Sequence, residues 1–309
     1  MLIPLYATLA VAVLFYLVIP LSGAVSVAHR WRRFRKRVAE VGRLPPLSYR
    51  DTTGAAGNEA SPAGGSFRLL GRIEAMEGEK RIWVQGEQSS ALVDLSSAPL
   101  HVLSPGAAEP GSVRRVAWRS ISSLAAGTRI MVGGRLRIEN GKPTFVDLPE
   151  ERLIAVTFDG EPDDLVRRLI IGGRRLNEYW TAIGPLSLAA GMTISSGLLL
   201  VLGGHSTFST VRALSFLAAI IPILPVLPPG LGLFLLYRVF WRRALRHRTR
   251  RDLLRLDGDG LETFSESERK AVGREQLKAD VLMLLALGCC GSAVLLNYVA
   301  AFLAWRVTP

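Results

Sequence analysis

The sequence predicts an α+β membrane protein, in which four transmembrane helices carry a small antiparallel β-barrel-like (OB-like) domain inserted between helices 1 and 2. Three observations lead to this fold class. Four long stretches are apolar, clusters of basic residues follow two of them, and the segment 67–158 alternates between apolar and polar residues. A hydrophobic content of 49% in 309 residues also indicates that much of the chain lies in a bilayer.

The four apolar stretches are each long enough to cross a bilayer, which takes roughly 20 residues of α-helix. They contain no Asp, Glu or Lys, and their one arginine, Arg212, lies at the edge of the third stretch. Soluble proteins rarely contain four helices of this kind, so each stretch is predicted to be a span. The predicted spans are residues 1–28, 182–204, 211–237 and 281–305.

The third predicted span contains four prolines. A proline removes a backbone donor and clashes with the preceding turn, so this helix is expected to kink or break. Two interpretations stay open, a single kinked span and a re-entrant or hinge segment. No acidic or basic residue accompanies the prolines, which weakens a transport role. The prolines are Pro222, Pro225, Pro228 and Pro229.

The second predicted span carries small residues spaced four apart. This spacing lets two helices approach closely, so packing within the protein or across a homo-oligomer is expected. In the fourth span, Asn297 is expected to form a hydrogen bond between helices. The small residues are Ser187, Gly191 and Ser195 on one row, and Ala189, Thr193 and Gly197 on another.

Basic residues follow the first and third spans. Short loops rich in Lys and Arg stay on the cytoplasmic side, so we predict a multi-pass protein of the cell membrane with both termini outside and the β domain in the cytosol. A cleaved signal peptide is the rival interpretation of residues 1–28, and it would place the β domain outside. The basic residues are candidates for contact with anionic lipid headgroups, or they act as a topology signal alone. They are Arg30, Arg32, Arg33, Arg35, Lys36 and Arg37 after the first span, and Arg242, Arg243 and Arg246 after the third.

Residues 29–50 are predicted to form a basic juxtamembrane helix. Their apolar side chains recur at helical spacing among the basic ones, which is typical of a helix lying on the membrane surface. The residues with this spacing are Trp31, Phe34, Val38 and Val41.

Three further segments connect the spans and the β domain. Residues 51–66 are rich in glycine and are expected to be a flexible linker. Residues 159–181 are predicted to contain a connecting helix with aspartates in its first turn, where carboxylates suit the helix dipole. Residues 238–280 are predicted to form a basic cytosolic loop and helix.

The β domain is predicted from period-two alternation. Apolar residues alternate with mostly polar ones over 67–76 and again over 129–138, as half-buried strands require. Asn140-Gly141 favours a tight turn, so residues 128–138 and 143–147 are expected to pair as a hairpin. Several short strands with glycine turns and no long helix indicate a small closed or partly closed barrel of OB-like size.

The sequence contains no recognisable catalytic or cofactor motif. Nucleotide-binding, hydrolase and metalloprotease patterns are missing, and the two cysteines, Cys289 and Cys290, are adjacent in an apolar span. We therefore expect no cofactor and no metal, and enzymatic activity is not indicated. The net charge of +12 lies mainly beside the spans rather than in the β domain, which argues against nucleic-acid binding.

Five arginines in the two longest predicted strands form the candidate ligand surface. If these strands are neighbours, the arginines form a basic patch for a phosphate, a lipid headgroup or an acidic partner. The alternative is a solvated outer face on which Glu74 and Asp94 act as counter-charges. The candidate residues are Arg68, Arg72, Arg129, Arg135 and Arg137.

Part of the chain resembles a known family. The residues that carry the likeness are 132–136 with Asn140-Gly141, then Phe158 and the Asp164-Leu165-Val166-Arg167-Arg168 run leading to Trp180. They resemble the GIDE (BAM) domain of MULAN-type membrane ubiquitin ligases, over at most residues 67–205. The resemblance implies a membrane-tethered interaction module. The family's C-terminal RING finger is missing, so ligase activity is not implied.

The function predicted from these observations is that of a multi-pass membrane-anchored interaction or scaffold protein. Its cytosolic β domain is expected to bind a protein partner or a lipid headgroup, and a homo-oligomer is possible. The alternative is a transport or channel component built on the proline-broken third helix.

Overall fold

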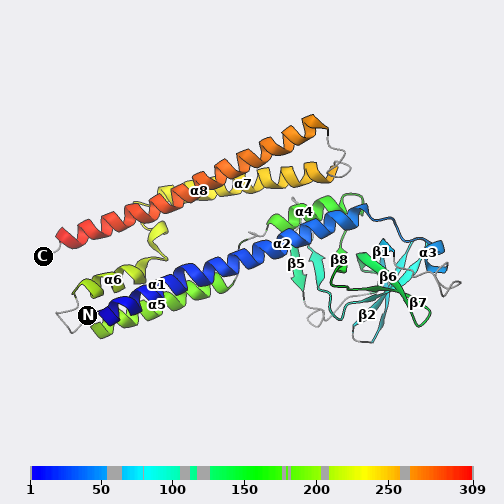
Figure 1. Ribbon diagram of the computed structural model, residues 1–309, viewed down its shortest axis with the longest axis horizontal. Coiled ribbons are helices and arrows are strands. Elements are labelled where there is room, and N and C mark those ends of the chain that lie inside the picture. The colour runs from blue at the N-terminus through cyan, green and yellow to red at the C-terminus, as the bar shows by residue number, and fades with distance from the viewer. Residues whose placement is uncertain are drawn as a thin grey trace. The chain divides into compact units, whose positions relative to one another are not determined.

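The computed structural model divides the chain into two compact units (Figure 1). Unit 1 comprises Met1–His29 and Glu178–Pro309, and unit 2 comprises Arg30–Asn177. Residues 54–64 of the predicted linker lie outside the described residues. The structure describes residues 2–53, 65–78, 80–104, 112–116, 126–175, 179, 182–202, 209–257 and 265–307.

Unit 2 contains a closed barrel of five strands, as its pairing order shows. The first strand in the chain pairs with the second along one half and with the sixth along the other, and this double pairing closes the order β1-β2-β3-β7-β6 into a ring. A register shift between Ile73 and Ala75 marks the bend in the first strand. The barrel strands are β1 (Ser66–Glu77), β2 (Arg81–Gly86), β3 (Ser90–Asp94), β6 (Arg129–Glu139) and β7 (Lys142–Val146).

Three more strands extend the sheet beyond the barrel from β6. They are β8 (Ile154–Phe158), β4 (Leu100–Leu103) and β5 (Val113–Val116), in that order. The prediction of a purely antiparallel sheet was wrong, because β3 pairs with β7, and β4 with β8, in parallel. Alternation along a strand predicts which face is buried, but it contains no information on the direction of the neighbouring strand.

The predicted hairpin is confirmed. β6 ends at Glu139 and β7 begins at Lys142, so Asn140 and Gly141 make the turn. Their φ angles are 51° and 74°. A two-residue turn of this kind needs positive φ at both positions, which Asn and Gly adopt at low cost.

Large aliphatic and aromatic side chains fill the barrel. Ile82, Val84, Val132, Leu136 and Phe145 are at most 1% exposed and belong to one contiguous core. Burial of these apolar side chains stabilises the barrel.

Helix α2 (Ile19–Arg43) corrects the prediction of a helix on the membrane surface. The residues that were expected to face the membrane, Phe34, Val38 and Val41, are buried inside unit 2. A Cβ on Gly133 of β6 would lie 2.2 Å from the Val41 side chain, so a glycine is required for the helix to lie this close to the strand. An apolar stripe predicts burial, but it does not say whether lipid or protein covers it. Two shorter helices complete unit 2, α3 (Tyr49–Thr53) and α4 (Leu165–Arg175).

Unit 1 is helical. Three helical segments of the described chain, Leu5–Arg43, Ile183–Val201 and Glu266–Leu303, are long and apolar enough to cross a membrane, and the first continues from unit 1 into unit 2. The first joins α1 (Leu2–Val13), the π-helical turn η1 (Leu14–Val18) and α2, and the others are α5 (Ile183–Leu202) and α8 (Glu266–Val307).

The predicted third span is not one helix. It consists of α6 (Ser209–Ile220), a short 3-10 turn η4 (Leu224–Val226) and the beginning of α7 (Leu231–Asp257). The expected break at the prolines is therefore confirmed. With 12 residues, α6 is about 18 Å long, well short of the roughly 30 Å of a hydrocarbon core.

Small residues let the helices of unit 1 pack closely. Ser187 of α5 donates a 2.7 Å hydrogen bond to the carbonyl of Phe15, which lies in the π-helical turn. A Cβ on Gly191 would lie 2.4 Å from the ring of Tyr16, so this contact also requires a glycine. The predicted row that contains Ser187 and Gly191 thus packs within the protein. In the other row, a Cβ on Gly197 would meet no atom of the described residues within 4 Å.

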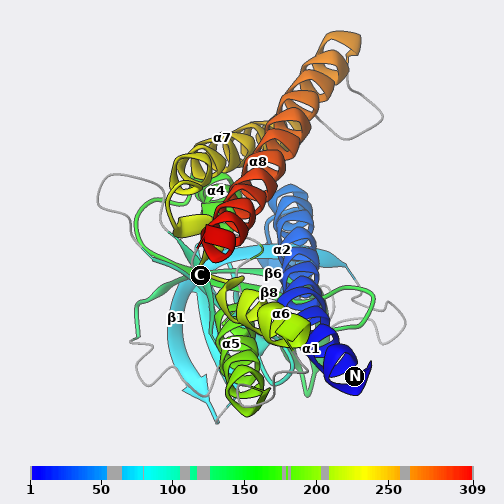
Figure 2. The ribbon, with the colours of Figure 1, turned by 90° about the vertical axis from the view of Figure 1, so that its left-hand side faces the viewer.

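Helices α7 and α8 lie side by side (Figures 1 and 2). Ala279, Ala286 and Ala293 of α8 are fully buried and recur every seven residues, and Ala244 of α7 is also fully buried. A seven-residue repeat keeps one narrow face of a helix against its partner, and alanine allows a short interaxial distance.

Candidate functional site

The five predicted arginines, called the arginine face below, lie on the outer side of β1 and β6. Because these strands pair, Arg72 lies directly opposite Arg129, and Arg135 lies opposite Ser66. The C-terminal end of α2 covers the strand between them at Gly133. The arginine face therefore has two parts, Arg72 with Arg129 on one side of the helix and the remaining three on the other.

Two members of the arginine face have backbone partners. Arg68 Nη1 donates a 2.9 Å hydrogen bond to the carbonyl of Gly42, near the end of α2, and Arg129 donates to the carbonyl of Gly160. Arg68 Nε and Arg135 Nε are buried and have no hydrogen-bond partner in the part of the chain that the structure describes. Arg72 and Arg137 are exposed.

Neither counter-charge expected from the sequence forms an ion pair with the arginine face among the described residues. Asp94 lies 3.7 Å from Arg81, which also lies 3.5 Å from Glu139. Among the described residues, no member of the arginine face forms an ion pair with a carboxylate at or below 4.0 Å, and Glu74 forms none either. The alternative in which Glu74 and Asp94 neutralise this surface is therefore not what the structure shows.

A satisfied polar cluster lies at the other end of β1. Glu77 accepts hydrogen bonds from Lys142 at 3.0 Å and from Trp83 Nε1 at 2.8 Å. These two bonds, with Lys142 as the larger cause, hold the pKa of Glu77 below its usual range. Because each charge here has a partner, this cluster is a structural one.

The basic residues of α2 have several different roles. Arg35 is buried, and Arg37 donates to the carbonyl of Arg152 at 2.8 Å and to Glu40 at 3.2 Å. Lys36 forms a weak surface pair with Glu40 at 3.8 Å. Arg30, Arg32 and Arg33 are exposed.

The three arginines of α7 that were predicted to contact lipid headgroups are exposed. A contact between His247 and Glu275, which the sequence did not predict, lies next to them. Arg242, Arg243 and Arg246 are exposed. At the next position, His247 Nδ1 lies 2.7 Å from a carboxylate oxygen of Glu275 of α8. These contacts hold the polar halves of α7 and α8 together.

His101 is a buried polar residue that the sequence did not indicate. Its ring is 7% exposed, and its centroid lies 4.5 Å from that of Phe34 of α2. Arg115 lies directly opposite His101 in the β4–β5 pair. Burial, followed by the charge of Arg115, lowers the pKa of His101 to about 4, so the ring is neutral at neutral pH. Its Nδ1 is buried and has no hydrogen-bond partner within the described ranges.

The proline break is tied to α8. Asn297 accepts a 3.0 Å hydrogen bond from the backbone N–H of Gly230, and its side-chain amide donates to the carbonyls of Leu224 and Leu227. The predicted hydrogen bond of Asn297 between helices is confirmed. Pro222, Pro225, Pro228 and Pro229 all lie in or beside the segment that Asn297 holds.

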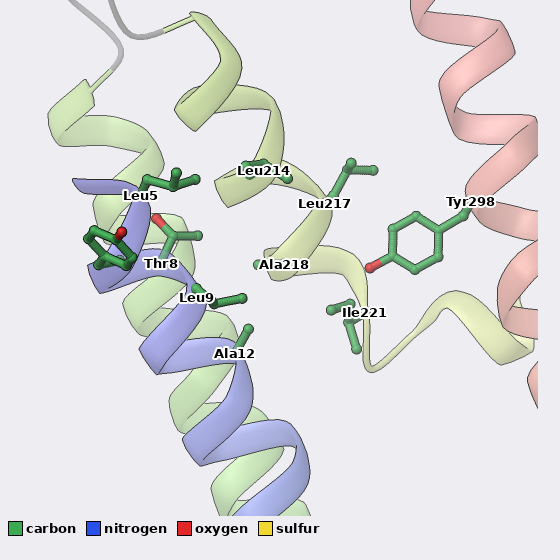
Figure 3. A pocket seen from close by; sticks show the side chains of 10 residues that line it. Leu5, Thr8, Leu9, Ala12, Leu214, Leu217, Ala218, Ile221 and Tyr298 are labelled. Atoms are coloured by element: carbon green, nitrogen blue, oxygen red, sulfur yellow. The ribbon is translucent and has the colours of Figure 1, made fainter. Parts of the chain in front are cut away.

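A cavity of about 290 Å³ lies in unit 1 (Figure 3). Thr8 and Ser215 share a 3.2 Å hydrogen bond beside it, and Figure 3 shows Tyr298 reaching from α8 toward Ala218 and Ile221. Among the described residues, the lining is apolar apart from the hydroxyl groups of Tyr6, Thr8 and Tyr298. The lining residues are Leu5, Tyr6, Thr8, Leu9 and Ala12 of α1, Leu214, Leu217, Ala218 and Ile221 of the α6 region, and Tyr298.

Within the described part of the chain, no group of three or more His, Cys, Asp or Glu side chains could hold a metal ion. Cys289 and Cys290 are both free thiols. No family model, curated protein or solved structure matches this chain. The resemblance to the GIDE domain therefore stays a prediction, based on the residues named above.

Proposed function

We propose that this protein is a multi-pass membrane-anchored interaction protein whose barrel domain binds an acidic segment of a partner protein through the arginine face. In this proposal α1–α2, α5 and α8 each cross the membrane, and α6 with the first part of α7 forms a fourth, broken crossing. Both termini lie outside the cell and the barrel lies in the cytosol, as the basic residues after the first and third spans favour.

The observation that carries the proposal is the lack of carboxylate partners. Among the described residues, Arg81 and Lys142 have acidic partners, whereas no member of the arginine face has one. Guanidinium groups bind carboxylates through charge-assisted, often bidentate hydrogen bonds. Five arginines on two paired strands therefore present donors that the domain does not use on its own acids.

The spacing of the arginines favours an extended partner. Arg129 and Arg137 are eight residues apart on β6, which corresponds to about 26 Å along a strand. This distance exceeds the size of a single phosphate group, and because α2 covers the strand at Gly133, separate carboxylates of one partner would bind the two parts of the arginine face. The closed five-strand order with a parallel β3–β7 pair also supports the OB-like interpretation, although fold alone does not define a ligand.

Capture of partners by the full-length protein tests this proposal. The protein would be cross-linked in native membranes, purified in detergent and examined by mass spectrometry. We expect the double variant Arg72→Glu/Arg137→Glu to lose a partner that wild type captures, because both side chains are exposed and their reversal repels acids.

The matched control is Lys80→Glu, which reverses a charge in the β1–β2 turn and should retain the partner. Cross-links of the partner to β1 or β6 would support the proposal. Equal capture by wild type and the double variant, or no reproducible partner, would contradict it.

A further inference from the structure

We propose that Arg30 and Arg115 form a binding site for the phosphate of a lipid headgroup, with the buried His101 ring as its floor. This site is separate from the arginine face, and its assignment to a lipid rests on the membrane crossing of α1–α2 proposed above. It lies where α2 and α4 cover the β4–β5 pair of unit 2.

The register of the strands brings two of the three residues together. His101 of β4 and Arg115 of β5 are directly opposite each other, and such pairs have Cβ atoms about 5 Å apart on one face of the sheet. The neighbouring Arg114 lies opposite Val102 and points to the other face. The same face of the sheet thus presents the imidazole and the Arg115 guanidinium.

Helix α2 brings the third residue to this face. Phe34 packs on the His101 ring with centroids 4.5 Å apart. Arg30 precedes Phe34 by four residues, so the two side chains lie on the same side of the helix, about 6 Å apart at Cβ. Trp31 contacts Phe34 edge-on, and Gly173 of α4 lies against both rings, so this part of α2 is held in place.

The electrostatics of the site agree with this geometry. Burial is the larger cause of the lowered pKa of Arg115, and the positive charge of Arg30 is the second cause, so the two cations are close enough to repel. Neither forms an ion pair within the part of the chain that the structure describes. An anion between them would remove this repulsion, and phosphate fits the fork of an arginine well.

His101 provides an independent indication of a ligand. The side chain is more than nine-tenths buried, and its Nδ1 has no well-aligned hydrogen-bond partner among the described residues, although hydrogen bonding to the backbone of Ala155 acts to raise the pKa of the ring. A buried polar atom without a partner is costly in a folded protein. A phosphate oxygen held by Arg30 and Arg115 would give this nitrogen a partner, because one tautomer of the neutral ring donates a hydrogen bond from Nδ1.

The position of Arg30 along the chain indicates a lipid as the source of the phosphate. Arg30 comes two residues after Ala28, the last residue of the first predicted span, and both belong to the continuous helix α2. Lipid phosphates lie at the ends of membrane-spanning helices, where basic residues meet them. Free inorganic phosphate is the other source of the same chemistry.

Calorimetric titration of the full-length protein in a neutral detergent tests the site. The probes are dihexanoyl phosphatidic acid, kept below its micellar concentration, and inorganic phosphate. We expect saturable binding of the lipid, weakened about tenfold by Arg30→Ala and by Arg115→Ala, because each removes a charge-assisted contact. The matched controls, Arg33→Ala on α2 and Arg114→Ala on β5, remove the same charge nearby and should stay within about twofold of wild type.

The remaining results would each overturn part or all of the proposed lipid site. Absence of saturable lipid binding, or equal losses in the controls and the site variants, would overturn the proposal. Inorganic phosphate binding as tightly as the lipid, with the same dependence on Arg30 and Arg115, would overturn the lipid as the source. If Arg115→Ala does not fold, as judged by circular dichroism, Arg30→Ala and the charge-conserving Arg115→Lys decide instead.

Discussion

The two units of this protein differ in where their large apolar side chains lie: in the interior of unit 2 and on the surface of unit 1. In unit 2 they point inward, and Ile82 and Phe145 have no exposed surface. Among the described residues of unit 1, most fully buried positions hold alanine or serine, such as Ala286 and Ser195, whereas Leu200 is 81% exposed. The buried apolar side chains of unit 2 are typical of a domain that folds in water. The exposed apolar side chains of unit 1 are typical of helices in an apolar environment.

This difference teaches that the two units gain stability from different interactions. Burial of apolar surface stabilises a barrel in water, since each buried large side chain contributes about 2 kcal/mol. Lipid tails are as apolar as leucine, so helices in a membrane gain little from burying leucine and depend on close packing and hydrogen bonds instead. Three substitutions sharpen this comparison, in order of expected effect.

The largest effect is expected in the barrel core. Phe145→Ala should lower the free energy of unfolding of unit 2 by about 4 kcal/mol, because it leaves a cavity among fully buried neighbours. Leu200→Ala in α5 should change stability by less than about 0.5 kcal/mol. Denaturant titrations in detergent, followed by circular dichroism, measure both. Similar losses for the two variants would show that the contrast between the units is false.

The second effect concerns pH. The pKa of His101 is about 4 when folded, below the ordinary value of 6.5. The unfolded chain therefore takes up a proton that the folded chain does not bind as pH falls from 6.5 toward 4. Keeping His101 neutral therefore contributes about 3 kcal/mol to the free energy of unfolding of unit 2. This contribution is complete above pH 6.5 and disappears as the pH falls toward 4.

The measurement is the unfolding free energy of unit 2 as a function of pH. His101→Phe should flatten the profile between pH 6.5 and 4, whereas His29→Gln, on an exposed residue, should leave it unchanged. A profile that His101→Phe does not alter would show that another group controls the pH dependence.

The smallest of the three effects is expected between α7 and α8. Ala286→Leu should destabilise the pair by about 2 kcal/mol, because the fully buried alanine leaves no space for extra methyl groups. The control is Leu284→Ala, at a side chain that is 69% exposed on the same helix. Resistance of the helices to unfolding by SDS distinguishes the two, and an unaffected Ala286→Leu variant would argue against alanine-mediated packing.

Local features of the fold were predictable from the sequence, and the partners of each element were not. Asn140-Gly141 defined the hairpin because few residues adopt its φ angles, and the prolines defined the helix break for the same kind of local reason. By contrast, the parallel β3–β7 pair and the burial of Val41 on Gly133 depend on residues distant in the sequence.

In the candidate sites, too, local features were predictable from the sequence and the partners of each residue were not. The alternation along β1 and β6 correctly placed five arginines on the outer face, but it could not reveal that Asp94 pairs with Arg81. Nothing in the sequence indicated that His101 belongs to a candidate site, because a single histidine in a short apolar strand looks like an ordinary core residue. Its significance comes from Arg115 and Phe34, which reach it from separate elements.

The bonds of Asn297 have a consequence for the order in which the protein is assembled. The Gly230 N–H and the carbonyls of Leu224 and Leu227 leave the ribosome 67 or more residues before the side chain that satisfies them. Until α8 is in place, these groups have no partner from that helix, and unpaired backbone groups are costly in an apolar environment. The broken segment therefore takes its final shape only after α8 has been synthesised and has packed against it.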